Sequence, residues 1–289
     1  MKKMYEIVDK KEEAPNVHRI IIREPMTAEK AQPGQFAILM PDEKGERIPM
    51  SIADTNKDTF TIFLLELGIS TAKIATLNKG DKLYCVVGPL GKPSIIEKYG
   101  RVILGGGCYG VGAIYPIAKA LKAAGNHVTT IIEARNKYLL YFEEELASVS
   151  DEVHIATSDG SVGTKGHVQD VLVQLIRDGE RYDHAKFIGC TYMMYNCSNI
   201  TAPYKIPTMV CLNTIMLDGT GMCGCCRVSV DGKTKFACVD GPEFDGHKVD
   251  WEELMKRKKS YQMEEMISYQ TAPHVCRALV ETILGENIE

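Results

Sequence analysis

The stretch RVILGGGCYGVGAIYPIAKALKAAGNHVTTIIE, residues 101–133, decides the fold. It opens with the apolar run Arg101–Leu104 and passes through three consecutive glycines. Apolar side chains then recur at helical spacing over Val111–Ala124, and a second apolar run, His127–Ile132, follows. A strand, a glycine turn, a helix and a second strand in this order predict a parallel β-sheet flanked by helices.

The glycine turn matches a nucleotide-binding pattern. Gly105 to Gly110 read G-x-G-x-x-G, with a strand before the pattern and a helix after it. In that context a pyrophosphate binds at the helix N-terminus, where backbone N–H groups are free. Glu133 ends the next strand, at about the position where an acid binds an adenosine ribose, which favours NAD over NADP. Arg135 is the alternative, since it could meet a 2′-phosphate, and a tight turn without a ligand also stays open.

Further strands and a helix continue this alternation to about residue 215. Each strand candidate is a short apolar run, as in a sheet that is buried on both faces. The candidates are the strands Val153–Ala156, Lys186–Ile188 and Thr208–Leu212 and the helix Lys165–Arg177. We therefore expect an α/β Rossmann-like dinucleotide-binding domain over residues 98–215.

Residues 1–97 have a different pattern of apolar and turn-forming residues. Short apolar runs alternate there with turn-forming residues such as Pro-Gly and Lys-Gly-Asp. The runs are Val17–Ile22, Gln35–Met40, Phe60–Leu65 and Lys82–Val87, with one short helix over Ser70–Leu77. Several short strands at close spacing predict a small antiparallel β-barrel.

The barrel segment carries candidate phosphate-binding groups. Arg47 offers a guanidinium that can form paired hydrogen bonds with a phosphate. Ser70 and Thr71 supply hydroxyl and amide groups at the start of the short helix. The alternative is a surface arginine and an ordinary helix cap. The histidines are dispersed along the chain, so no catalytic acid–base residue is expected.

The most specific motif lies near the C-terminus. Residues 218–226 read DGTGMCGCC, and Cys238 follows twelve positions after Cys226. The pattern D-x4-C-x2-C-x11-C has the spacing of plant-type [2Fe–2S] ferredoxins, with a carboxylate in place of the first thiolate. The intervening glycines allow the loop to wrap closely and to point N–H groups at sulfur. The motif predicts a [2Fe–2S] cluster with the ligands Asp218, Cys223, Cys226 and Cys238.

Other interpretations of this motif stay open. Two cysteines at C-x2-C spacing, a further cysteine and His247 could hold a structural zinc ion, and the thiols could be free and buried. Cys225 lies one residue out of register with the ligand spacing. Asp218 could instead cap the loop, with Cys225 or Cys211 as the fourth ligand, although Cys211 belongs to an apolar strand run.

Composition limits the class of protein. Of 289 residues, 45% are hydrophobic and 25% charged, which excludes extensive disorder, and the formal net charge of −4 does not favour nucleic acid as a partner. No apolar run approaches about 18 residues, and residues 1–6 lack an apolar signal core. Because no secretory signal is evident, the ten cysteines indicate a metal site and not a disulfide scaffold. We expect a cytoplasmic protein that does not contact a membrane.

A barrel, a Rossmann-like domain and a [2Fe–2S] loop in this order resemble the ferredoxin–NADP reductase superfamily. The chain is most similar to its electron-transfer subunits: those of dihydroorotate dehydrogenase, of sulfide dehydrogenase and of NADH-dependent reduced ferredoxin:NADP oxidoreductase. The matching segments are Arg47–Ala53, Gly88–Pro93, Gly105–Lys119, Met193–Met194 and Met216–Phe244. Asp218 and the tail over residues 245–254 favour the ferredoxin:NADP or sulfide dehydrogenase branch.

The resemblance implies site residues and domain limits. The FAD-contacting residues would be Arg47, Pro49, Met50, Ser51, Ile52, Gly68, Ser70 and Thr71. The residues along the dinucleotide would be Gly107, Gly110, Glu133 and Met194. The domains would be an FAD-binding barrel over 1–97, the nucleotide domain over 98–215, the cluster module over 216–248 and a helical tail over 249–289. The sequence departs from the family pattern at Arg47, four residues before Ser51, and at Cys190, which replaces a proline.

The resemblance also implies a function. A nicotinamide moves two electrons at once and an iron–sulfur cluster moves one, so FAD must stand between them. We expect a heterodimeric, bifurcating enzyme in which this chain exchanges electrons with NAD(H) or NADP(H). A larger flavin and [4Fe–4S] subunit would connect it to ferredoxin. The alternatives are an electron-transfer subunit for sulfide or dihydroorotate oxidation and a redox-sensing subunit without turnover.

Overall fold

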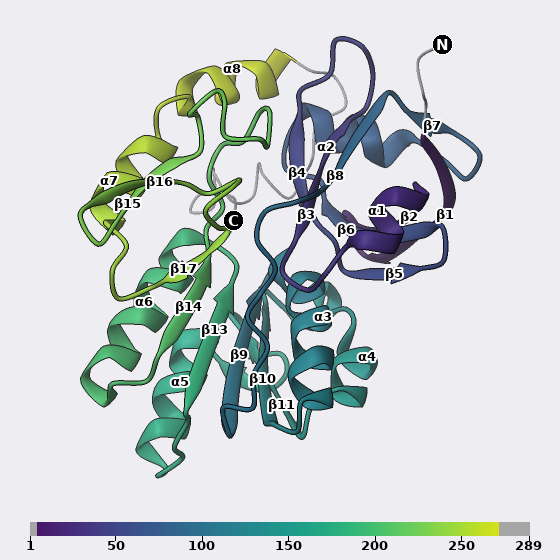
Figure 1. The fold of residues 1–289 in the computed structure, drawn as a ribbon. Helices are drawn as coiled ribbons and strands as arrows, with labels where there is room; N and C mark the ends of the chain where they lie inside the picture. The colour runs from purple at the N-terminus through teal and green to yellow at the C-terminus, as the bar shows by residue number, and fades with distance from the viewer. Residues whose placement is uncertain (1–4, 272–289) are drawn as a thin grey trace.

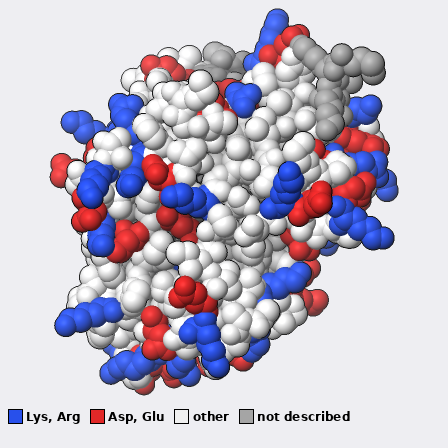
Figure 2. Space-filling model, in the orientation of Figure 1, with Lys and Arg blue, Asp and Glu red and all other residues white. Residues whose placement is uncertain are grey.

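The computed structural model describes residues 5–271, and Figure 1 shows their arrangement. The N-terminal strands and the C-terminal segment over residues 227–258 both lie above the large sheet in Figure 1. No helix among the described residues is long and apolar enough to cross a membrane. Acidic and basic side chains are intermingled on the face in Figure 2, around a broad uncharged area.

The N-terminal part is an antiparallel β-barrel, as predicted. One sheet has the order β5-β6-β2-β1-β7 and the other β4-β3-β8. The strands are β1 (Tyr5–Ala14), β2 (Val17–Arg23), β3 (Phe36–Met40), β4 (Ile48–Ser51), β5 (Asp54–Asn56), β6 (Thr59–Leu65), β7 (Lys82–Leu83) and β8 (Cys85–Leu90), with the helices α1 (Pro25–Lys30) and α2 (Ile69–Thr76). Alternate apolar side chains such as Ile20, Ile22 and Ile62 fill its core. The run predicted as one strand over Lys82–Val87 is divided between β7 and β8.

The middle of the chain forms the predicted α/β domain. Its sheet has the order β12-β11-β10-β9-β13-β14-β17, and all pairs except β14–β17 are parallel. The elements are β9 (Arg101–Gly107), α3 (Gly110–Ala123), β10 (His127–Ala134), α4 (Glu143–Ser148), β11 (Glu152–Thr157), β12 (Thr164–Lys165), α5 (Val168–Arg177), β13 (His184–Ile188), α6 (Thr191–Thr201) and β14 (Thr208–Cys211). Helices α3 and α4 cover one face of the sheet, and α5 and α6 cover the other (Figure 1).

The strand order creates a binding crevice. Strand β9 lies between β10 and β13, so the chain winds in opposite directions on its two sides. In open α/β sheets, ligands bind beyond the carboxyl ends of the strands at such a point. Here β9 ends at Gly107, and Gly189 directly follows the end of β13.

The C-terminal part contains a hairpin that the sequence analysis did not predict. It consists of β15 (Arg227–Val230) and β16 (Lys233–Phe236), followed by β17 (Glu243–Asp245), α7 (Trp251–Lys258) and α8 (Gln262–Thr271). Helices α7 and α8 agree with the predicted helical tail, whose residues 272–289 lie outside the described residues.

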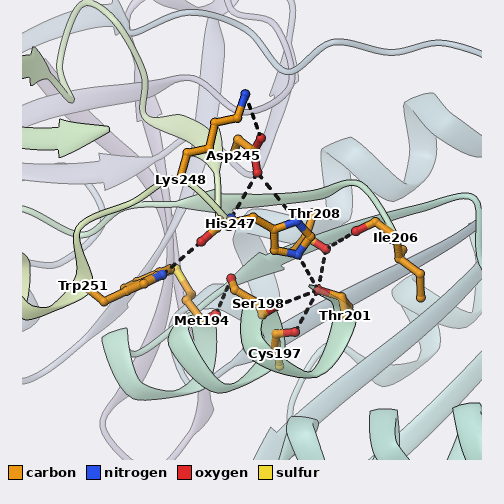
Figure 3. Close-up of polar contacts among 11 residues, drawn as sticks. Met194, Cys197, Ser198, Thr201, Ile206, Thr208, Asp245, His247, Lys248 and Trp251 are labelled. Atoms are coloured by element: carbon orange, nitrogen blue, oxygen red, sulfur yellow. Dashed lines mark hydrogen bonds and ion pairs between the residues drawn. The ribbon is translucent and has the colours of Figure 1, made fainter. Parts of the chain in front are cut away.

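Strand β17 and a polar network, buried at Thr201 and Thr208 and exposed at His247, attach this part to the nucleotide domain. Val210 of β14 pairs with Phe244 of β17. Figure 3 shows His247 above α6, with its Nε2 2.9 Å from Thr201 Oγ1, which also accepts a hydrogen bond from Thr208. Trp251 Nε1 donates to the Gly246 carbonyl at 3.0 Å. The cluster module and the sheet therefore share one packed interface.

Candidate functional site

A cavity of about 300 Å³ lies where the barrel meets the nucleotide domain. Its barrel wall includes Pro49, Met50, Ser51 and Thr71, and the opposite wall is formed mainly by Tyr109, Gly112 and residues 211–214. A Cβ atom on Gly112 would lie 2.2 Å from Phe63 Cδ2, so only glycine lets α3 approach the barrel here. A mostly apolar cavity with a few polar groups is typical of a cofactor site.

A larger groove of about 990 Å³ continues from this cavity. Leu67 lines both spaces, and residues 212–217 run along both. The groove lies beside Gly68, where α2 begins, and charged residues of both signs line it: Arg227 and Arg257, and Glu46, Glu264 and Glu265. A helix N-terminus and two arginines are groups that stabilise a phosphate.

The structure brings several of the predicted FAD-binding residues to these spaces. Pro49, Met50, Ser51 and Thr71 line the cavity, and Gly68 lines the groove. The other three residues have protein partners.

Of those three, Arg47 Nε donates to the Leu217 carbonyl at 2.5 Å, and the buried Ser70 hydroxyl donates to Glu46 Oε2 at 2.6 Å. Ile52 packs in the barrel core. Contact of all eight residues with FAD stays a prediction.

The glycine turn is built for close packing. Cys108 has φ 49°, in the left-handed region, and a Cβ on Gly110 would lie 1.9 Å from the Ile188 carbonyl oxygen. The start of α3 can therefore approach the end of β13. Gly107 pairs with Glu133 in the sheet, so these two predicted residues lie side by side.

Glu133 is buried and has partners of its own. Its Oε2 accepts a hydrogen bond from Val168 N at 2.7 Å, at the start of α5, and lies 3.5 Å from His167 Nδ1. Burial raises the pKa of Glu133 above its ordinary value, while Val168 and His167 act in the opposite direction. Met194 is fully buried in α6. The contacts of Glu133 and Met194 with a nucleotide stay predictions.

In the cluster loop, the Asp218 carboxylate accepts two hydrogen bonds from the backbone. Its Oδ1 accepts from Thr220 N at 2.7 Å and its Oδ2 from Cys223 N at 2.6 Å. The hydrogen bond from Thr220 contributes most to holding the pKa of Asp218 below its ordinary value. This is the geometry of a loop cap, and because each carboxylate oxygen has two acceptor sites it leaves lone pairs for a metal. The positive φ angles of Gly219 and Gly221, 77° and 84°, allow the tight turn.

The remaining predicted ligands form a second pair. Cys226 and Cys238 are buried, with their Sγ atoms 3.2 Å apart. Burial, and then the neighbouring Cys226, raises the pKa of Cys238 to about 12. The candidate donors thus lie as two pairs, Asp218 with Cys223 and Cys226 with Cys238.

Two pairs of donors suit two iron atoms better than one zinc ion. Within residues 5–271, no three His, Cys, Asp or Glu side chains converge as they would around a single ion. His247 bonds to Thr201, away from the loop, and Cys211 lies in β14 and lines the cavity. A [2Fe–2S] cluster has two irons with two protein ligands each, so these residues fit that group.

Several residues of the cavity belong to none of the predicted site residues. Tyr109, Asn213 and Thr214 line it. Asn213 and Thr214 follow β14 within three residues of its end, and polar residues beyond a parallel strand are the available signal for a site. Tyr109 lies inside the glycine motif, which specifies the backbone there and not this side chain.

A flavin-type barrel, a nucleotide-binding sheet with a glycine turn, and a cluster loop define an iron–sulfur reductase with the ferredoxin–NADP reductase fold. Residues 213–250 match the iron–sulfur cluster binding domain of dihydroorotate dehydrogenase B. The chain is 46% identical over 267 residues to the Thermotoga maritima homologue of the dihydroorotate dehydrogenase B (NAD(+)) electron transfer subunit, covering 92% of this chain and 94% of the relative. The chain belongs to this family of electron transfer subunits.

Solved structures agree with this assignment. The chain is similar to a chain of the NADH-dependent reduced ferredoxin-NADP oxidoreductase, determined in work on flavin-based electron bifurcation, with TM-score 0.87 and 44% identity, over 93% of this chain and 98% of that chain. Phthalate dioxygenase reductase shares the fold, with TM-score 0.59 and 16% identity, over 79% of this chain and 86% of that chain. The protein is an oxidoreductase subunit with an electron-transfer role. The expected cofactors, FAD, a [2Fe–2S] cluster and a pyridine nucleotide, agree with the family and the fold.

Proposed function

We propose that this chain is the electron-transfer subunit of an NADH-dependent reduced ferredoxin:NADP oxidoreductase. The observation that carries the proposal is the cavity between β4 and the glycine turn, in a chain whose cluster loop is part of the same packed body. The similarity to the ferredoxin-NADP oxidoreductase supports this choice within the family.

In the proposed site, the cavity holds the flavin ring. Pro49, Met50 and Ser51 form the barrel side, and Tyr109 and Asn213 form the nucleotide side. Gly68 and the start of α2 would hold the pyrophosphate of FAD, and Arg227 and Arg257 in the groove would hold its adenylate half. Bound FAD supplies the exchange between hydride and single-electron transfer. The mostly apolar wall of the cavity excludes water from the ring.

The pyridine nucleotide binds at the edge of the sheet, where β9 and β13 end. Gly107 and Gly110 let Glu133, Met193 and the end of β13 pack closely against the turn, and the start of α3 would offer its backbone N–H groups to a phosphate. Because Tyr109 belongs to both the glycine turn and the cavity wall, a nucleotide on the turn would lie next to the flavin.

The cluster ligands in this proposal are Asp218, Cys223, Cys226 and Cys238. Cys223 is exposed while Cys226 and Cys238 are buried, so one side of the cluster faces solvent or a partner. The partner we propose is a larger flavin and [4Fe–4S] subunit that exchanges electrons with ferredoxin. Residues 213–250 match the dihydroorotate dehydrogenase B domain, so electron transfer to a dihydroorotate dehydrogenase is the second candidate function.

Co-purification from the native host tests the proposal. A tagged chain should bring down a larger subunit that contains flavin and [4Fe–4S] clusters, and the complex should reduce NADP with NADH and reduced ferredoxin. Capture of a dihydroorotate dehydrogenase would favour the second candidate. A chain that lacks FAD after anaerobic purification would contradict both.

A further inference from the structure

A chain of hydrogen bonds connects the C-terminal tail with the proposed flavin cavity. Lys258 Nζ donates to Thr191 Oγ1 at 3.1 Å, and Thr191 Oγ1 donates to Asn213 Oδ1 at 3.0 Å. Asn213 Nδ2 donates to the Tyr109 hydroxyl at 2.5 Å, and that hydroxyl donates to the Gly189 carbonyl at 3.0 Å. This series of hydrogen bonds thus runs from α7 through the start of α6 and the residues after β14 to the glycine turn.

The two ends of this series of hydrogen bonds, Lys258 and the Gly189 carbonyl, together fix the direction of its bonds. An ammonium group has three donors and no acceptor, so Thr191 must accept from Lys258 and donate its own proton onward. The Thr191 proton then requires the oxygen of the Asn213 amide, which turns the amide nitrogen toward Tyr109. At the other end, the Gly189 carbonyl can only accept, and it receives hydrogen bonds from the Tyr109 hydroxyl at 3.0 Å and from Asn213 Nδ2 at 3.4 Å. Hydrogen bonds aligned in one direction also polarise one another.

Two members of the chain face the cavity. Tyr109 and Asn213 line it, while Lys258 and Thr191 lie outside it. Lys258 is the last residue of α7. Burial lowers the pKa of Lys258, and the nearby Cys190 and Glu265 act in the opposite direction. The neighbouring Arg257 donates to the Cys225 carbonyl at 3.1 Å. Helix α7 therefore contacts both the cluster loop and this hydrogen-bond chain.

We propose that Lys258 is a positioning residue, which acts through Thr191 to fix the polar groups of Asn213 and Tyr109 against the flavin. This inference rests on the proposed function only in that the cavity holds FAD. Without the ammonium group, Thr191 can direct its proton elsewhere, and Asn213 Oδ1 then loses its donor. The Asn213 amide would be held only through Tyr109 and the Gly189 carbonyl. The flavin would then meet a wall whose polar groups are held less firmly.

The test compares three full-length variants with the wild type. Lys258→Met removes the charge and keeps the length of the side chain, Lys258→Arg restores a cation, and Lys256→Met removes an exposed charge from the same helix. Anaerobic rapid mixing with NADH gives the rate of flavin reduction and its nucleotide dependence between pH 6 and pH 9. Hydrogen exchange in peptides covering residues 189–194 and 211–216 reports the wall without using the flavin.

We expect a change in the Lys258→Met variant and none in the Lys256→Met control. Lys258→Met should slow flavin reduction about tenfold at saturating NADH, the size of one hydrogen bond to a charged group, and should speed exchange in both peptides. Lys258→Arg should recover most of the rate, and Lys256→Met should match the wild type. An unchanged reduction rate in Lys258→Met, or an equal loss in Lys256→Met, would overturn the inference. If the wild type holds no FAD, the proposed function fails, and exchange alone decides whether Lys258 orders the wall.

Discussion

The ammonium of Lys186 lies 2.9 Å from Glu243 Oε2, in the interior of the protein. Lys186 belongs to β13 and is 1% exposed, and Glu243 begins β17, which follows the cluster loop. The other carboxylate oxygen, Oε1, accepts from the hydroxyl of Ser94, in the segment that leaves the barrel. One carboxylate thus joins the barrel exit, the nucleotide sheet and the cluster module.

Glu243→Gln should destabilise the whole chain. The substitution leaves the Lys186 ammonium buried without its counter-charge, a change that costs about 3–5 kcal/mol when one partner of a buried ion pair is removed. Denaturant unfolding followed by circular dichroism measures this loss. Glu252→Gln, on the exposed face of α7, is the matched control. Equal stability of the two variants would show that the ion pair is not an anchor.

His184 should make stability depend on pH. Its ring stacks on Tyr99 with 4.1 Å between centroids, and burial, with the nearby Lys186, lowers the pKa of His184 to about 4. The unfolded chain therefore takes up a proton at higher pH than the folded chain. The stabilising contribution of neutral His184 is full above about pH 6.5 and is lost as the pH falls toward 4.

His184→Phe keeps a ring against Tyr99 but cannot titrate. The difference in unfolding free energy between wild type and this variant should change in favour of the variant between pH 7 and pH 5. A difference that stays constant over this interval would mean that His184 does not titrate in this way.

Glu133 should contribute to the choice of nucleotide. A carboxylate at the end of β10 accepts from ribose hydroxyl groups and repels a 2′-phosphate, so the wild type should reduce its flavin faster with NADH than with NADPH. Glu133→Gln keeps an acceptor for Val168 N and removes the charge. The preference should fall about tenfold, as for a lost hydrogen bond to a charged group. A wild type that prefers NADPH would indicate Arg135 as the discriminating residue.

Asp218 should act as a cluster ligand through its carboxylate. Asp218→Cys should retain a cluster with changed EPR g-values and a changed midpoint potential, because an oxygen ligand is replaced by sulfur. Cys225→Ala should leave both properties unchanged. The opposite pattern, an unaltered spectrum in Asp218→Cys and a lost cluster in Cys225→Ala, would mean that Asp218 only caps the loop.

The sequence predicts the parts of this protein that rest on local patterns. The glycine turn at 105–110 lies where the G-x-G-x-x-G motif placed it, because a strand and a helix on either side specify such a turn. The β15–β16 hairpin could have been predicted, since Asp231-Gly232 is a typical hairpin turn and both residues have positive φ, 54° and 68°.

Contacts between residues that are far apart in the sequence could not be predicted from local patterns. Lys258 and Thr191 are 67 positions apart, and the spacing of charged residues in the tail does not indicate which helix α7 meets. Helix α6 was missed because Thr191–Thr201 mixes polar, β-branched and aromatic residues without a clear apolar period. Its apolar side chains pack in the core beside the sheet. Its last residue, Thr201, takes part in the polar network with His247.

An anaerobic titration of the purified chain with NADH, followed by absorbance and EPR, tests the central claim most directly. We predict that NADH bleaches the flavin band and that a reduced [2Fe–2S] signal then appears. In Cys226→Ala the iron–sulfur absorbance should be absent while FAD stays near stoichiometric and is still bleached. A flavin band that NADH leaves unchanged in the wild type would contradict the claim that this chain passes electrons from the nucleotide through FAD to the cluster.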